Sequence, residues 1–72
     1  MKKIKKIKIK LNGKIKSIYE NYKIQTLLND LNIPLKKVAI ELNQEILDKK
    51  KLKKIKLRNN DKIEIVHFIG GG

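Results

Sequence analysis

The closing stretch Ile63-Glu64-Ile65-Val66-His67-Phe68-Ile69-Gly70-Gly71-Gly72 decides the fold, because a mostly apolar run ends there in three glycines. We predict that residues 63–69 form a final β-strand with apolar side chains on both faces, a pattern typical of a central strand. Side chains alternate along a strand, so Ile63 and Ile65 share one face while Val66 and Phe68 share the other. The sequence leaves open which of the two faces is buried.

The glycines at 70–72 have no side chains to pack, and glycine loses more backbone entropy on ordering than any other residue. We therefore predict a flexible tail over residues 70–72 that carries the terminal carboxylate beyond the domain. The alternative is an ordinary frayed chain end, since such ends often contain small residues.

A length of 72 residues allows one small domain, which we place at residues 1–69. The chain has no cysteine, so it offers no disulfide, thiolate metal site or thiol nucleophile. His67 is its single histidine, and we expect neither a metal site nor a catalytic residue. The N-terminus lacks the apolar segment of a signal peptide, and the apolar runs are too short to span a membrane. We expect a soluble intracellular protein.

The net charge of +12 would ordinarily suggest a nucleic acid or another anionic surface as a partner. However, the basic residues are eighteen lysines and one arginine, and recognition of bases and phosphates relies strongly on arginine. The three aromatic residues are too few for an obvious base-stacking platform. We therefore do not expect nucleic acid as the partner, although a basic nucleic-acid-binding module remains the alternative from a different class of function.

The remaining segments predict a hairpin, a helix and two short strands. Apolar and lysine residues alternate over 7–11, Asn12-Gly13 is a strong hairpin signal, and residues 14–19 would return as the antiparallel partner. Ile24, Leu27, Leu28 and Leu31 form one apolar stripe of a helix that Asn32 ends.

Residues 38–43 alternate as a third strand, and Asn43-Gln44 is a tight turn into a short strand at 45–47. The lysine-rich residues 48–56 suggest a solvated connection with one helical turn, and residues 58–61 a turn before the last strand. This order predicts an α+β fold, a mixed sheet of four to five strands with one main helix on one face.

The same order resembles the β-grasp fold of ubiquitin-like proteins, and more closely the ThiS family of sulfur carriers. Val38-Ala39-Ile40-Glu41-Leu42-Asn43 resembles the middle hairpin of that family, and Leu31-Asn32-Ile33 its helix exit. Asn60-Asp61-Lys62-Ile63-Glu64-Ile65-Val66, running on to the glycines, resembles its closing segment. The resemblance covers about residues 7 to 72, and the glycine tail is its most specific part.

The chain also departs from the family pattern. Asn43-Gln44 stands where the family usually has Asn-Gly, and Asn60 and Asn32 stand where it usually has glycine. Asparagine is the best non-glycine residue at positive φ, so the backbone can be kept. The family motif needs two terminal glycines, and here a third is present.

The resemblance implies a protein substrate rather than an enzyme. In similar carriers a ThiF-type adenylyltransferase uses ATP and magnesium to join the C-terminal carboxylate, here that of Gly72, to AMP. A cysteine desulfurase system then supplies a persulfide, and the resulting thiocarboxylate donates sulfur to a ThiG-type thiazole synthase for thiamine. Gly70 and Gly71 would thread through channels too narrow for a Cβ. No cofactor would be bound by the carrier, and its compartment would be a bacterial cytoplasm or a plastid stroma.

His67, Phe68 and Ile69 are the candidate partner interface, because they precede the tail. Lys36-Lys37 and Lys49-Lys50-Lys51 could steer an acidic partner surface, or they are simply a solvated basic face. Within the same fold, the small subunit of molybdopterin synthase and a tRNA-thiolation carrier use the same chemistry, and both remain alternatives at this stage.

Overall fold

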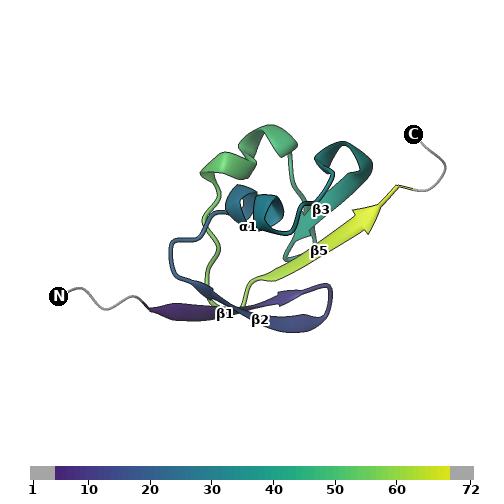
Figure 1. Ribbon diagram of the computed structural model, residues 1–72. Coiled ribbons are helices and arrows are strands. Elements are labelled where there is room, and N and C mark those ends of the chain that lie inside the picture. The colour runs from purple at the N-terminus through teal and green to yellow at the C-terminus, as the bar shows by residue number, and fades with distance from the viewer. Residues whose placement is uncertain (1–4, 69–72) are drawn as a thin grey trace.

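The computed structural model describes residues 5–68, which form five strands, one α-helix and two short 3₁₀ helices (Figure 1). In chain order these elements are β1 (Lys6–Leu11), β2 (Lys14–Tyr19), α1 (Ile24–Asp30), η1 (Leu35–Lys37), β3 (Val38–Leu42), β4 (Glu45–Ile46), η2 (Lys49–Lys54) and β5 (Lys62–His67). The element order confirms the predicted hairpin, helix, second hairpin and closing strand.

The five strands form one mixed sheet in the order β2-β1-β5-β3-β4. The last strand therefore lies at the centre, parallel to β1 and antiparallel to β3. Ile63 is held on both sides, because its Cα partner is Leu11 on β1 and Leu42 on β3. This arrangement confirms the predicted β-grasp architecture and the central place of the closing strand.

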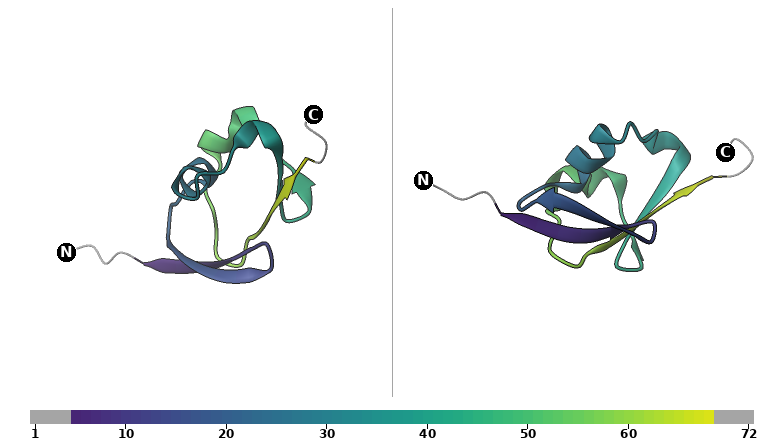
Figure 2. Two further views of the ribbon diagram at one scale, coloured as in Figure 1. Left: turned by 45° about the vertical axis from the view of Figure 1, so that its right-hand side comes forward. Right: turned by 60° about the horizontal axis from the view of Figure 1, so that its bottom comes forward.

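In the described part of the chain, all helical segments lie on one face of the sheet, and the other face has no covering layer (Figure 2). The core between these layers consists of buried aliphatic side chains, namely Ile9, Ile18, Ile24, Leu27, Leu28, Val38, Ile40, Leu52, Leu57, Ile63 and Ile65. Ile63 and Ile65 are in this core, whereas Val66 and Phe68 are about half exposed. The structure thus shows which face of β5 is buried. Ile7 and Leu31 are partly buried and pack against the margin of this core.

The lysine-rich segment contributes more to the core than its sequence predicts. Asp48 caps η2, since its side chain accepts a hydrogen bond from the Lys50 backbone N–H at 2.9 Å. Leu52 on this helix and Leu57 after it are buried. The connection is also fixed to the entrance of α1, because the Leu57 N–H donates to the Tyr22 carbonyl at 2.7 Å.

Within residues 5–68, six residues other than glycine have positive φ, namely Asn12, Asn21, Asn32, Asn43, Gln44 and Asn60. Five of them are asparagines, which tolerate the left-handed region better than most residues because their side chain bonds locally. Asn32 and Asn60 keep this backbone where the family usually has glycine, as the sequence predicts. Gln44, with φ 74°, is the exception that lacks this advantage.

We expect Gln44→Gly to stabilise the protein. The substitution relieves the steric cost of a left-handed non-glycine residue, which exceeds the entropy that glycine adds to the unfolded chain, for a net gain of about 0.5–1 kcal/mol. Urea denaturation of the two proteins measures this difference. Glu45→Gly is the matched control, since Glu45 begins β4 and its replacement should lower the free energy of unfolding. Equal or lower stability of Gln44→Gly would contradict the prediction.

Candidate functional site

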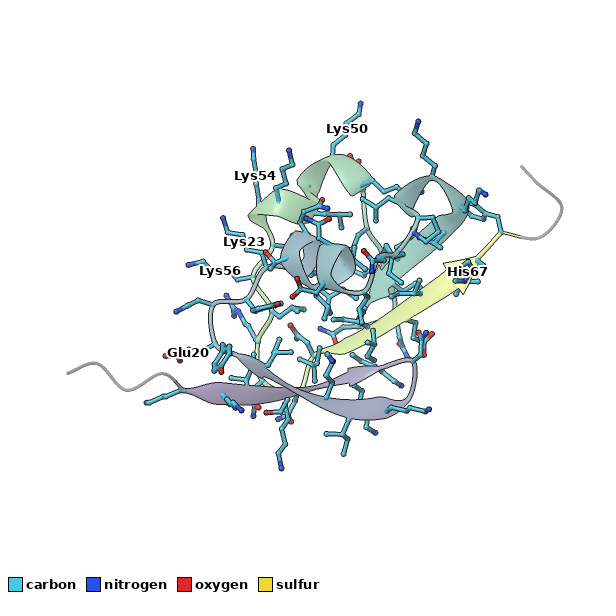
Figure 3. All side chains as sticks on the ribbon, viewed as in Figure 1. Glu20, Lys23, Lys50, Lys54, Lys56 and His67 are labelled. Atoms are coloured by element: carbon cyan, nitrogen blue, oxygen red, sulfur yellow. The ribbon has the colours of Figure 1, made fainter. Side chains whose placement is uncertain are left out.

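The end of β5 delivers the chain to one fixed point at the edge of the molecule. His67 is the last residue of the strand and has Val38 as its Cα partner on β3. The Phe68 N–H then donates to the Lys37 carbonyl at 2.9 Å, which holds the first residue after the strand against η1. Figure 3 shows His67 at this end of β5. The predicted interface residue Ile69 and the predicted tail residues 70–72 lie outside the described residues.

Lysine residues of two separate elements, η1 and η2, contribute contacts to Phe68 at this exit. The Lys49 ammonium lies 5.4 Å from the centroid of the Phe68 ring, a cation–π geometry worth about 0.5–1 kcal/mol when exposed. Lys36 and Lys37 belong to η1, which also provides the carbonyl that holds Phe68. Two of the lysine groups that we considered for steering therefore contribute to the exit itself. Lys50 instead extends away from the molecule, as Figure 3 shows.

An apolar surface continues from Phe68 across the uncovered face of the sheet. Val66 pairs with Ala39 there, and Ile46 lies further along, paired with Glu41. The exposed fractions are 51% for Phe68, 49% for Val66 and 75% for Ile46. We call Ala39, Ile46, Val66 and Phe68 the exit surface. Exposed apolar groups gathered beside a chain end are typical of a protein interaction site.

Side chains from two turns form hydrogen bonds with the backbone of β5. The Asn12 side-chain oxygen accepts from the Ile65 N–H at 2.7 Å, and the Asn43 side-chain oxygen accepts from the Lys62 N–H at 2.9 Å. Asn43 also donates from Nδ2 to Asp61 Oδ1 at 3.0 Å, while Asp61 Oδ2 accepts from the Arg58 N–H at 2.8 Å. These bonds fix the strand that carries the exit.

Residues 5–68 contain no group of three or more His, Cys, Asp or Glu side chains that could hold a metal ion. His67 is exposed at the strand end, and nothing in the described part of the chain assigns it a chemical role. In this same part, no helix is long and apolar enough to cross a membrane. The candidate site in the described part of the chain is therefore the end of β5 together with the exit surface.

A small β-grasp domain whose central last strand leads out to a glycine-rich end defines the class of this protein. A sequence model of the ThiS family matches residues 9–72, and the chain belongs to this family. It is 42% identical over 65 residues to the sulfur carrier protein ThiS of Bacillus subtilis, covering 89% of this chain and 98% of that one.

A solved structure of the thiamine biosynthesis protein ThiS from Geobacter metallireducens superposes with a TM-score of 0.81 at 28% identity. That match covers 92% of this chain and all of the other. These findings confirm the resemblance given above and the expectation of a sulfur carrier for thiamine biosynthesis.

A further relative is a thiazole synthase from Paramagnetospirillum magneticum, 36% identical over 66 residues. The match covers 92% of this chain but 20% of the synthase, so the chain spans a fifth of the length of that relative.

Of the sequence-predicted interface residues, the structure describes His67 and Phe68 and brings both to the chain exit. Ala39, Ile46 and Val66 were not predicted as interface residues from the sequence. Val66 could have been predicted if the buried face of β5 had been known. Burial of Ile63 and Ile65 implies by alternation that Val66 and Phe68 both point outward. Ile46 and Ala39 required the strand order, which brings β3 and β4 alongside β5.

We expect Asp61→Ala to lower the free energy of unfolding by about 1–2 kcal/mol, because it removes two hydrogen bonds that fix the start of β5. Urea denaturation measures the change. The control is Glu45→Ala, which removes an exposed carboxylate from β4. If both variants were equally stable, the bonds around Asp61 would not be what holds the strand.

Proposed function

We propose that this chain is a protein co-substrate, not an enzyme, and that the carboxylate of Gly72 is the group that carries sulfur. Membership of the ThiS family and the match to nearly the full length of the Bacillus subtilis carrier support this assignment. The single observation that carries it in this chain is the central strand β5, which is fixed on both sides and leads into Gly70-Gly71-Gly72.

In the proposed cycle, an adenylyltransferase of the ThiF type first activates the chain end. The Gly72 carboxylate attacks the α-phosphate of magnesium-bound ATP, so pyrophosphate leaves and an acyl adenylate forms. The terminal sulfur of a persulfide, loaded by a cysteine desulfurase, then displaces AMP and forms an acyl disulfide. A second thiol of the partner cleaves that disulfide, which releases the thiocarboxylate. The chain itself contributes no thiol, since it contains no cysteine.

We propose thiazole synthase as the acceptor of the sulfur. The similarity of this chain to a fifth of a protein named thiazole synthase supports a direct association between carrier and acceptor. The match to the ThiS family over residues 9–72 favours this acceptor over molybdopterin synthase and over tRNA thiolation. The compartment would be the one in which these enzymes work, a bacterial cytoplasm or a plastid stroma.

A folded domain is needed because the tail alone would bind poorly. Ordering each backbone residue costs about 1–2 kcal/mol, and glycine loses the most. The exit surface can supply the compensating energy, since it lies at the end of β5 and exposes Phe68, Val66 and Ile46. The role of Phe68 is then to dock the domain, while the glycines provide a thin strand that enters the active site.

The test of this function is intact-protein mass spectrometry with ATP, magnesium, cysteine, a cysteine desulfurase and a ThiF-type adenylyltransferase that is active on the Bacillus subtilis carrier. We expect the mass to rise by the difference between one sulfur and one oxygen atom, with the change mapped to Gly72. An unchanged mass beside a modified Bacillus subtilis carrier would refute the proposal and make the alternative of a basic nucleic-acid-binding module the better hypothesis.

Gly71→Ala is the variant that tests the threading of the tail. The added Cβ should slow adenylation without altering thermal stability, because we expect the folded domain to end at residue 69. Adenylation at the wild-type rate would show that the channel admits a side chain, and Gly71 would then have no special role.

Phe68→Ala should raise the KM of the adenylyltransferase for the carrier by about tenfold, or about 1.4 kcal/mol, a loss of the size found when an important interface residue is truncated. The kcat should change little, because Phe68 precedes Gly72, which carries the reacting carboxylate, by four residues. Ile15→Ala is the matched control, since Ile15 is 69% exposed on β2, away from the exit. An equal KM for both variants would exclude the exit surface as the docking site.

A further inference from the structure

On the uncovered face of the sheet, the residues along β5 and their cross-strand partners form three successive bands, which are basic, acidic and apolar. The strand register places Lys10 and Lys62 opposite each other in the first band. Glu41 and Glu64 are opposite each other in the second band. Ala39 and Val66, which are paired members of the exit surface, form the third band towards the end of β5, and Ile46 of the same surface flanks the second band on β4. The bands follow from the alternation of side chains along β5, which turns residues 62, 64 and 66 to the same face.

The carboxylate pair in the middle band is unusual for this chain. Only seven acidic residues accompany nineteen basic ones, yet two of the seven are direct cross-strand partners. Like charges in that position destabilise a sheet. A lysine at position 64 would have avoided the repulsion between the two carboxylates. The pairing of Glu41 with Glu64 therefore does not stabilise the fold.

The carboxylate pair also adjoins the exit surface on two sides. Ile46 is the Cα partner of Glu41 on β4, and Val66 follows Glu64 by two residues on the same face of β5. Any protein that covers Val66 and Ile46 therefore removes water from both carboxylates. Burying charge is costly unless the other surface pairs it.

We propose that Glu41 and Glu64 form an anionic docking point for an arginine on the enzyme that receives the tail. Cross-strand partners have Cβ atoms about 4.5–5.5 Å apart, so a single guanidinium with its five N–H donors can bond to both carboxylates. Arginine suits this position better than lysine because its planar fork is more weakly hydrated and binds carboxylates in pairs. This inference rests on the proposed function and adds the partner chemistry.

The neighbouring basic band, Lys10 and Lys62, would also fix how the enzyme is positioned on the sheet. If the enzyme bound with its arginine shifted along β5 from Glu64 to Lys62, then Lys10 and Lys62 would repel that arginine. Exposed lysines contribute little to neutralising the carboxylates within the chain, since ion pairs in water are weak. The competing occupant is a second copy of this chain, whose basic band could face the carboxylates.

The experiment measures binding without catalysis, by titration calorimetry of the full chain with the adenylyltransferase and with thiazole synthase in the absence of ATP. The double variant Glu41→Gln/Glu64→Gln should raise the Kd for at least one of the two enzymes by about 10- to 100-fold. The control Glu20→Gln/Glu45→Gln removes the same charge elsewhere and should change the Kd less than threefold. Analytical ultracentrifugation should show the wild-type chain as a monomer.

Each outcome separates this inference from the proposed function. An equal Kd for the two double variants overturns the docking point and leaves the sulfur-carrier function intact. Intact wild-type binding without modification of Gly72 overturns the function but not the docking point. If the wild-type chain is a dimer and the Glu41→Gln/Glu64→Gln variant is a monomer, the carboxylate pair serves self-association and the docking point is overturned. If the wild-type chain binds neither enzyme, both proposals are overturned.

Discussion

The pairing of β5 with β1 on one side and β3 on the other is the interaction on which the rest of the structure depends. It joins two hairpins that are distant in sequence, and it places Ile63 and Ile65 in the centre of the core. The strand that the fold needs most is also the strand that leads to the chain end. The position of the exit is therefore as well defined as the core, and any change that loosens β5 affects stability and presentation together.

The β-grasp fold follows from local signals that the sequence states clearly. Asn12-Gly13 predicts the first hairpin because both residues accept positive φ, and the structure has φ of 50° and 83° there. The stripe Ile24, Leu27 and Leu28 predicts the helix because only one face of α1 is buried. These elements depend on residues close in sequence, so pattern and structure agree.

Other features depend on contacts between distant segments and could not be predicted. The closing stretch has apolar side chains on both faces, Ile63 and Ile65 on one and Val66 and Phe68 on the other, and the structure shows that Ile63 and Ile65 are the buried pair. The lysines of η2 obscure Leu52, which becomes a core residue because this helix folds back onto α1. The contact of Lys49 with Phe68 and the pairing of Glu41 with Glu64 likewise join residues more than fifteen positions apart. The chemistry of the tail came from the family resemblance.

The outer strands of the sheet have a consequence for the behaviour of the protein in a crowded solution. β2 and β4 have one paired side each in the described sheet, and an unpaired strand side can template cross-β aggregation. β4 is limited to two residues, while β2 carries Lys14 and Lys16, whose charges oppose the approach of another strand. The lysine excess thus has a use that requires no ligand, since colloidal repulsion keeps a small protein with an exposed apolar surface dispersed.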